Sequence, residues 1–197
     1  MSVIAIVGCG IAGDEAAFSA RRADPEARIV MVTHEDQPLY SACILADYVA
    51  GELSQNRVIL KNLEHYKRAG IELILSTQVM DWSPDRNILH LENRDVPYDR
   101  IILATGSRPV VPSLPGSDKK GVFTLKSLLD AENLRGAKGN SAVVIGSGPI
   151  GIETAIALKR KGFSVVLIEV LDCVLPRLFD PLVARSLQDL LERGGIE

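Results

Sequence analysis

The chain of 197 residues has little of several features that would each indicate a particular function. Aromatic residues make up 5% of it, with one tryptophan, and the net charge is −3. Neither a base-stacking surface nor a basic patch for nucleic acid is therefore expected. No apolar run approaches the length of a membrane span, so the sequence predicts no transmembrane helix and no membrane partner.

Cysteine is also scarce. Cys9, Cys43 and Cys173 are widely separated, and the absence of a CxxC pair argues against a zinc knuckle or a dithiol motif. A sparse, odd set of cysteines is typical of free thiols in a reducing compartment. The first apolar run follows Met-Ser directly, without a basic segment or a cleavage site, so we expect no secretory signal and a cytoplasmic protein.

The composition that is present, 47% hydrophobic and 24% charged, is that of a globular protein. An apolar run, a glycine turn and a helix-like segment follow one another twice along the chain. The two cycles predict strands at 2–7, 28–33, 142–146 and 164–169, and helices at 11–22, 149–161 and 181–193. Continuous apolar strands alternating with helices indicate an α/β fold with parallel sheets covered on both faces.

The segment between the two cycles predicts smaller elements. Helices are expected at 42–50, 62–69 and 126–135, and strands in "IELIL", "QVMDW", "NILHL" and "RIILATG". The stretch 108–121 contains three prolines and two glycines and is the best candidate for a linker.

A Gly-x-Gly-x-x-Gly turn joins strand to helix in each cycle. The six glycines are Gly8, Gly10 and Gly13, and Gly146, Gly148 and Gly151. In such a turn the first glycine permits a tight bend, the second lets a pyrophosphate approach the backbone, and the third lets helix and strand pack closely. The alternative, two purely structural turns, does not explain why each motif stands between a buried strand and a helix. The helix starts that would bind the anion contain Ile11, Ala12, Pro149 and Ile150.

An acidic residue follows the second strand of each cycle. Glu35 lies 22 residues beyond Gly13, and Glu169 lies 18 residues beyond Gly151. A carboxylate at this place can accept a hydrogen bond from a ribose 2′-hydroxyl and repels a 2′-phosphate, so Glu169 favours NADH over NADPH. Two dinucleotide sites in one chain indicate electron relay between a mobile hydride carrier and a bound one.

Three stretches together resemble a known family. "IAIVGCGIAGDEAA", "YDRIILATGSRPVVPSLPG" and "VVIGSGPIGIETAIAL" are similar to the two-dinucleotide-binding flavoproteins, the FAD-dependent pyridine nucleotide–disulfide oxidoreductases. The resemblance implies a Rossmann-like FAD-binding domain with a β-rich crossover at 1–111. It further implies a linker and connecting helix at 112–138, and the first part of a Rossmann-like NAD(P)-binding domain at 139–197.

The resemblance also implies roles for single residues. Ala104, Thr105 and Gly106 are expected close to the flavin nucleotide, and Glu153 near the nicotinamide side of the NADH site, although a solvated helix carboxylate is the alternative for Glu153. Only 46 residues follow Gly151, fewer than a whole nucleotide-binding domain needs, so we expect an N-terminal fragment of a longer, homo-oligomeric protein.

Cys43 stands in "PLYSACILADYVAGEL", which resembles two subgroups of this family in different ways. In the subgroup of CoA-disulfide reductases, NADH oxidases and NADH peroxidases, a single redox cysteine begins the helix at this place. The nitrite- and rubredoxin-reductase-like subgroup reads Tyr-x-Arg and then Leu-Ser-Lys at this place, and "HYKRAGIEL" resembles the text that follows in that subgroup. Cys43 is therefore either a catalytic thiol, activated at a helix start, or a small buried hydrophobe.

The function expected from these features is an FAD-dependent oxidoreductase. It would pass hydride from NADH to FAD, and electrons on to a disulfide, to O₂ or peroxide, or to a redox protein. The alternative is a nucleotide-binding module or electron-transfer subunit without turnover of its own.

Overall fold

A computed structural model describes residues 2–197, which form two compact units. The first contains the residues up to Ser41 together with Ile59–Arg108. The second contains Ala42–Val58 together with Pro109–Glu197. Each unit is built around one of the two predicted strand–turn–helix cycles, so the α/β, Rossmann-like fold class is confirmed.

The first unit is built on a four-stranded parallel sheet with the order β3-β2-β1-β7. Its strands are β1 (Val3–Val7), β2 (Arg28–Val32), β3 (Ile71–Ile74) and β7 (Arg100–Leu103). Ala5 on β1 is paired with Val30 on β2 and with Ile101 on β7. This register places the carboxyl ends of β1, β2 and β7 together at one edge of the sheet, where parallel α/β folds bind their ligands.

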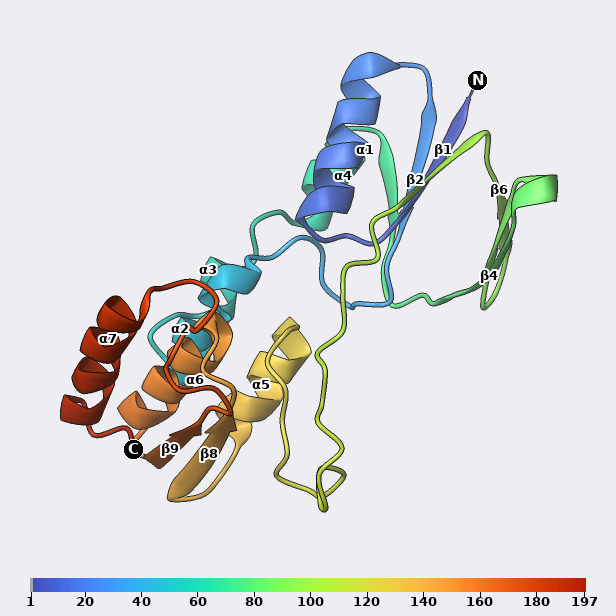
Figure 1. Cartoon of the computed structure of the whole chain (residues 1–197). Coiled ribbons are helices and arrows are strands. Elements are labelled where there is room, and N and C mark those ends of the chain that lie inside the picture. Colours follow the sequence, from blue (N-terminus) through green and yellow to red (C-terminus); the bar gives the residue numbers. More distant parts are fainter. Residues whose placement is uncertain (1) are drawn as a thin grey trace. The chain divides into compact units, whose positions relative to one another are not determined.

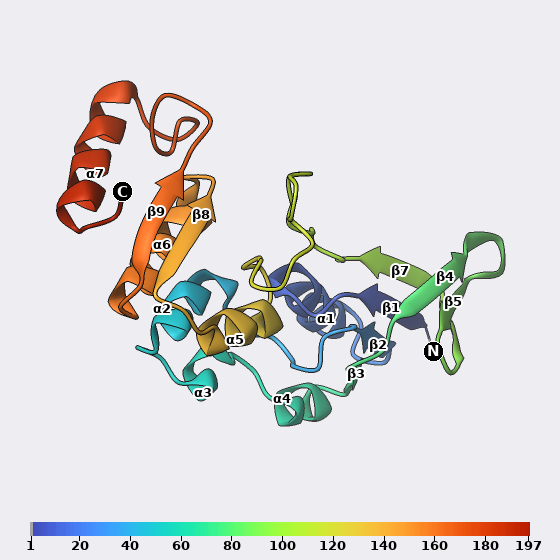
Figure 2. The same cartoon turned by 90° about the horizontal axis from the view of Figure 1, so that it is seen from below.

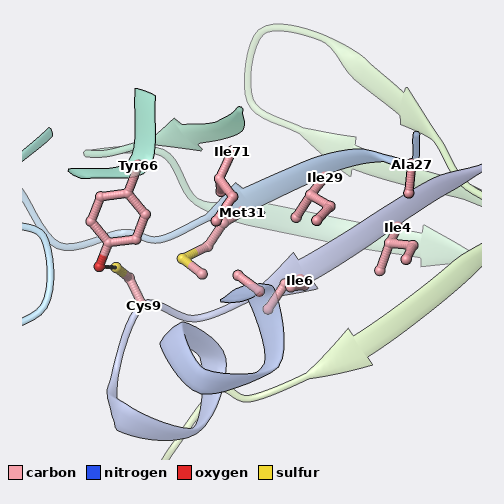
Figure 3. Close-up of a cluster of buried hydrophobic side chains, with 9 residues drawn as sticks. Ile4, Ile6, Cys9, Ala27, Ile29, Met31, Tyr66 and Ile71 are labelled. Atoms are coloured by element: carbon pink, nitrogen blue, oxygen red, sulfur yellow. Dashed lines mark hydrogen bonds between the residues drawn. The ribbon is translucent and has the colours of Figure 1, made fainter. Parts of the chain in front are cut away.

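Both faces of this sheet are buried, because side chains alternate along each strand. Ile6 and Met31 point to the face covered by α1 (Ile11–Ala23) and α4 (Leu63–Arg68), as Figure 3 shows for the side chains themselves. Ala5 and Val30 point to the opposite face. The continuous apolar runs of β1 and β2 are thus explained by burial on both sides.

A three-stranded antiparallel meander covers the second face of the sheet (Figure 1). It consists of β4 (Val79–Ser83), η2 (Pro84–Arg86), β5 (Ile88–Leu91) and β6 (Asp95–Pro97). His90 connects the three strands, since its Nε2 lies 2.9 Å from Ser83 Oγ and its Nδ1 lies 2.8 Å from Asp95 Oδ1. This meander is the β-rich crossover expected from the sequence.

The second unit contains the second cycle. Its elements are α5 (Leu128–Gly136), β8 (Ser141–Ile145), α6 (Pro149–Arg160), β9 (Ser164–Ile168) and α7 (Pro181–Arg193). Strands β8 and β9 are parallel, with Val144 opposite Leu167. Figure 2 shows α6 packed along this two-stranded sheet. Ile196 forms a parallel bridge to Val165 on β9.

Residues 42–58 pack against α5 and α6 of the second unit. They form η1 (Ala42–Ile44), α2 (Leu45–Ala50) and α3 (Gln55–Val58). The Arg135 guanidinium lies 4.5 Å from the centre of the Tyr48 ring, a cation–π distance. Arg160 Nη1 lies 2.9 Å from Glu52 Oε1. These contacts join α2 and the turn after it to two helices that lie far from them in the sequence.

The elements predicted from apolar periodicity are present, and most of their ends lie within one or two residues of the expected positions. The sequence did not predict α3 and β6, which have four and three residues, because segments so short carry no recognisable period. No helix among residues 2–197 is both long and apolar enough to span a bilayer.

Candidate functional site

The first glycine turn is closed by backbone contacts at two of its three glycines. Gly8 has φ +107°, and a Cβ there would lie 2.1 Å from the carbonyl oxygen of Ala104. A Cβ on Gly13 would lie 2.0 Å from the carbonyl oxygen of Gly8. A Cβ on Gly10 would have no heavy atom within 4 Å. The fold itself therefore requires Gly8 and Gly13, whereas Gly10 faces open space where a phosphate could approach the backbone.

The second turn repeats this arrangement at its second and third glycines. Gly146 has φ +98°, and its N–H donates to the carbonyl of Ile168 at 2.8 Å. A Cβ on Gly151 would lie 1.9 Å from the carbonyl oxygen of Gly146, and one on Gly148 would have no heavy atom within 4 Å. In both turns the middle glycine is the one that neither a positive φ nor a close backbone contact explains.

The helix starts behind the two turns carry no side-chain cap. Gly10 caps α1 and Gly148 caps α6, and neither offers a side-chain oxygen to the free N–H groups of the first helical turn. By contrast, Asn62, Ser127 and Asp180 cap α4, α5 and α7 with their side chains. The exposed helix starts, which include Ile11, Ala12, Pro149 and Ile150, therefore leave N–H groups and a positive helix end available to an anion. The residues present fit a pyrophosphate in both places.

The segment after β7 completes the first site. The N–H of Ala104 donates to the carbonyl of Val7 at 2.8 Å, and the carbonyl of Ala104 lies against Gly8. Thr105 and Gly106 follow and are exposed, with φ +70° at Gly106. The structure thus brings Ala104–Gly106 beside the Gly8–Gly13 turn. Glu35 lies three residues beyond β2, which is hydrogen-bonded to β1 along its whole length.

A buried polar cluster supports the start of α1. The Asp14 carboxylate accepts hydrogen bonds from Tyr66 Oη at 2.8 Å and from Lys61 Nζ at 2.6 Å. Lys61 Nζ also lies 3.7 Å from the centre of the Phe18 ring. Cys9 Sγ is 3.6 Å from Tyr66 Oη, as drawn in Figure 3. Burial raises the pKa of the Cys9 thiol, which favours its neutral form.

The cluster leads to a prediction about stability. We expect Lys61→Met to destabilise the first unit by about 2 kcal/mol, because it leaves the buried Asp14 carboxylate without its cation. Urea denaturation measures the change. Lys67→Met on the exposed face of α4 is the matched control, and equal stabilities of the two variants would contradict the prediction.

In the second unit, Glu169 is held by four hydrogen bonds. Its Oε2 accepts from the N–H of Ser147 at 2.9 Å and from Ser147 Oγ at 2.7 Å. Its Oε1 accepts from the N–H groups of Val170 and Leu171 at 2.8 and 3.1 Å. The hydrogen bonds from Ser147 are the main reason why the pKa of Glu169 falls to about 2. Glu169 is therefore an oriented anion beside the second turn.

The remaining candidates are exposed. Glu153 lies on α6 with its side chain in solvent. Cys43 is a free, exposed thiol in η1, within the segment that packs on α5 and α6. The alternative of Cys43 as a buried hydrophobe is therefore wrong. The sequence did not indicate the Asp14–Lys61–Tyr66 cluster or the contact between Ser147 and Glu169, because their members lie 22 to 52 residues apart.

A family model described as pyridine nucleotide-disulphide oxidoreductase matches residues 2–197. The chain belongs to this family. Among curated proteins, the NADH oxidase of Methanocaldococcus jannaschii is 33% identical over 205 residues, which cover 98% of this chain and 45% of that protein.

Two solved structures are also similar to this chain. Reduced Bacillus anthracis CoADR-RHD has a TM-score of 0.95 and 26% identity, over 100% of this chain and 37% of that one. The reductase in a covalent putidaredoxin reductase–putidaredoxin complex has a TM-score of 0.89 and 32% identity, over 100% of this chain and 49% of that one. The chain thus spans about half the length, or less, of these relatives.

Proposed function

We propose that the whole protein is a flavin-dependent NADH oxidoreductase, with FAD bound by the first unit and NADH by the second. The observation that carries the proposal is the pair of uncapped helix starts, each behind a glycine turn whose middle glycine faces open space. When bound, FAD supplies the redox chemistry, since it accepts hydride and passes electrons on. The residues of this chain bind and orient the two nucleotides.

In the first unit, the N–H groups at Ile11 and Ala12 bind the pyrophosphate of FAD, and Gly10 lets it approach. Glu35 accepts a hydrogen bond from the ribose, and Ala104–Gly106 lie along the flavin nucleotide. The Asp14–Lys61–Tyr66 cluster holds the start of α1 in place for this task.

In the second unit, the start of α6 at Pro149 and Ile150 binds the pyrophosphate of NADH. Glu169 accepts from the adenosine ribose, and its charge favours NADH over NADPH because a 2′-phosphate would be repelled. We place Glu153 near the nicotinamide side of the NADH site.

The electron acceptor is a disulfide, O₂ or peroxide, or a redox protein. The names of the similar proteins support this range of acceptors, because they include an NADH oxidase and a putidaredoxin reductase in a covalent complex with putidaredoxin. The three free cysteines, Cys9, Cys43 and Cys173, support action in the reducing cytoplasm. We also infer that the whole protein is a homo-oligomer.

An anaerobic spectrum tests the function. The purified protein should show flavin absorbance that NADH bleaches, and NADPH should bleach it more slowly. Protein that remains colourless after reconstitution with FAD, yet binds adenine nucleotides, would instead identify a binding module without turnover. A binding module is the second candidate function because the chain covers only 45% of the NADH oxidase that it resembles.

Cys43 is proposed as the thiol that receives electrons from the flavin, since its side chain is exposed. We expect Cys43→Ser to abolish turnover of a disulfide or of peroxide, while NADH-dependent reduction of artificial dyes stays within twofold of wild type. Cys173→Ser is the matched control and should affect neither reaction. Unchanged disulfide and peroxide turnover in Cys43→Ser would remove Cys43 from the mechanism.

A further inference from the structure

Ser147 is the middle residue of the Gly146–Gly148 turn, and it is completely buried. It is too far inside the turn to contact solvent, yet both of its donors, the backbone N–H and the hydroxyl, point to one oxygen of Glu169. A buried hydroxyl at 2.7 Å from a carboxylate oxygen forms a charge-assisted hydrogen bond, which is short and strong. Ser147 therefore fixes Oε2 of Glu169 from the protein side.

The other oxygen of Glu169 is held differently. Oε1 accepts from the backbone N–H groups of Val170 and Leu171, and both of these residues are exposed. Because the two oxygens are held from two sides, the carboxylate cannot rotate freely about its last side-chain bond.

The first turn provides an internal comparison. Cys9 occupies the same place between Gly8 and Gly10 that Ser147 occupies between Gly146 and Gly148. Its thiol lies 3.6 Å from Tyr66 Oη, and thus points to the cluster around Asp14. A thiol is also a much weaker donor than a hydroxyl. The hydrogen bonds from Ser147 to the acidic residue are therefore specific to the second turn and do not follow from the glycine motif.

We propose that Ser147 is a positioning residue that makes the second site select nucleotides with a free 2′-hydroxyl over nucleotides with a 2′-phosphate. The inference rests on the proposed function of the second unit and names the residue that gives Glu169 its selectivity. A carboxylate held by these hydrogen bonds can accept a hydrogen bond from a 2′-hydroxyl without losing further side-chain entropy. It also cannot turn away from a 2′-phosphate. A carboxylate without the hydrogen bond from the Ser147 hydroxyl can turn away from a 2′-phosphate more easily.

Binding of two redox-inactive probes tests the proposal. The dissociation constants of ADP-ribose and of 2′-phospho-ADP-ribose are measured by calorimetry for the wild type, Ser147→Ala and Ser147→Cys. Loss of a hydrogen bond to a charged group changes binding about tenfold. We therefore expect both variants to reduce the ratio of the two constants about tenfold, with weaker binding of ADP-ribose and tighter binding of the 2′-phosphate.

Ser141→Ala, at the exposed amino end of β8, is the matched control and should keep the wild-type ratio. A general loss of structure would weaken the binding of both probes together and would not change the ratio of the two dissociation constants tenfold. A carbon-13 NMR titration adds a readout independent of binding: the pKa of Glu169 should rise from about 2 in the wild type toward its ordinary value in Ser147→Ala.

Two results would overturn the proposal, and they are distinguishable. If the wild type binds ADP-ribose and the Ser147 variants keep its ratio, Ser147 does not set selectivity, while the nucleotide site stands. If the wild type binds neither probe, the second turn is not a nucleotide site, and the proposed function fails with it.

Discussion

Gly10→Val is expected to reduce FAD affinity at least a hundredfold while the first unit stays folded. Gly10 has φ −75°, which valine adopts readily, and a Cβ at this place meets no heavy atom within 4 Å. The valine side chain would therefore occupy only the space that a pyrophosphate needs. Flavin content after reconstitution and the thermal unfolding midpoint measure the two effects separately.

Gly136→Val is the matched control, because a Cβ on Gly136 also has no neighbour within 4 Å and the residue lies outside both glycine turns. It should retain flavin. A Gly10→Val protein that is as yellow as the wild type would show that the pyrophosphate does not lie beside this glycine. That result would contradict the proposal that the first turn binds FAD.

Gly151→Ala is expected to destabilise the second unit by about 3 kcal/mol, the upper part of the range for overpacking. The added methyl group would lie 1.9 Å from the carbonyl oxygen of Gly146, so α6 would have to move away from the turn that follows β8. Backbone atoms cannot move aside as the end of a flexible side chain can. Urea denaturation followed by circular dichroism measures the loss.

Gly148→Ala, three residues earlier in the same turn, serves as the comparison. Its methyl group would meet no atom of the protein, so its stability should stay within about 0.5 kcal/mol of wild type. Equal stabilities of the two variants would mean that the third glycine of the turn does not set the distance between helix and strand.

Much of the fold was predictable because it depends on local pattern. The apolar runs of β1, β2, β8 and β9 and the glycines between strand and helix are short-range signals, and each reports a constraint on a few neighbouring residues. The positions of Glu35 and Glu169 followed from the length of a strand–helix–strand cycle. The short elements α3 and β6 escaped prediction because four and three residues are too few to show a period.

The sequence by itself determined the two strand–turn–helix cycles, their parallel sheets and the place of the acidic residue after each. Only the tertiary structure decided which side chains serve each turn: Ser147 holds Glu169, whereas Cys9 points to Tyr66. It also grouped residues 42–58, with Cys43, with the second unit. The physical reason is that hydrogen bonds and ion pairs act over a few ångströms in space, and the chain brings their partners together from positions that no local period connects.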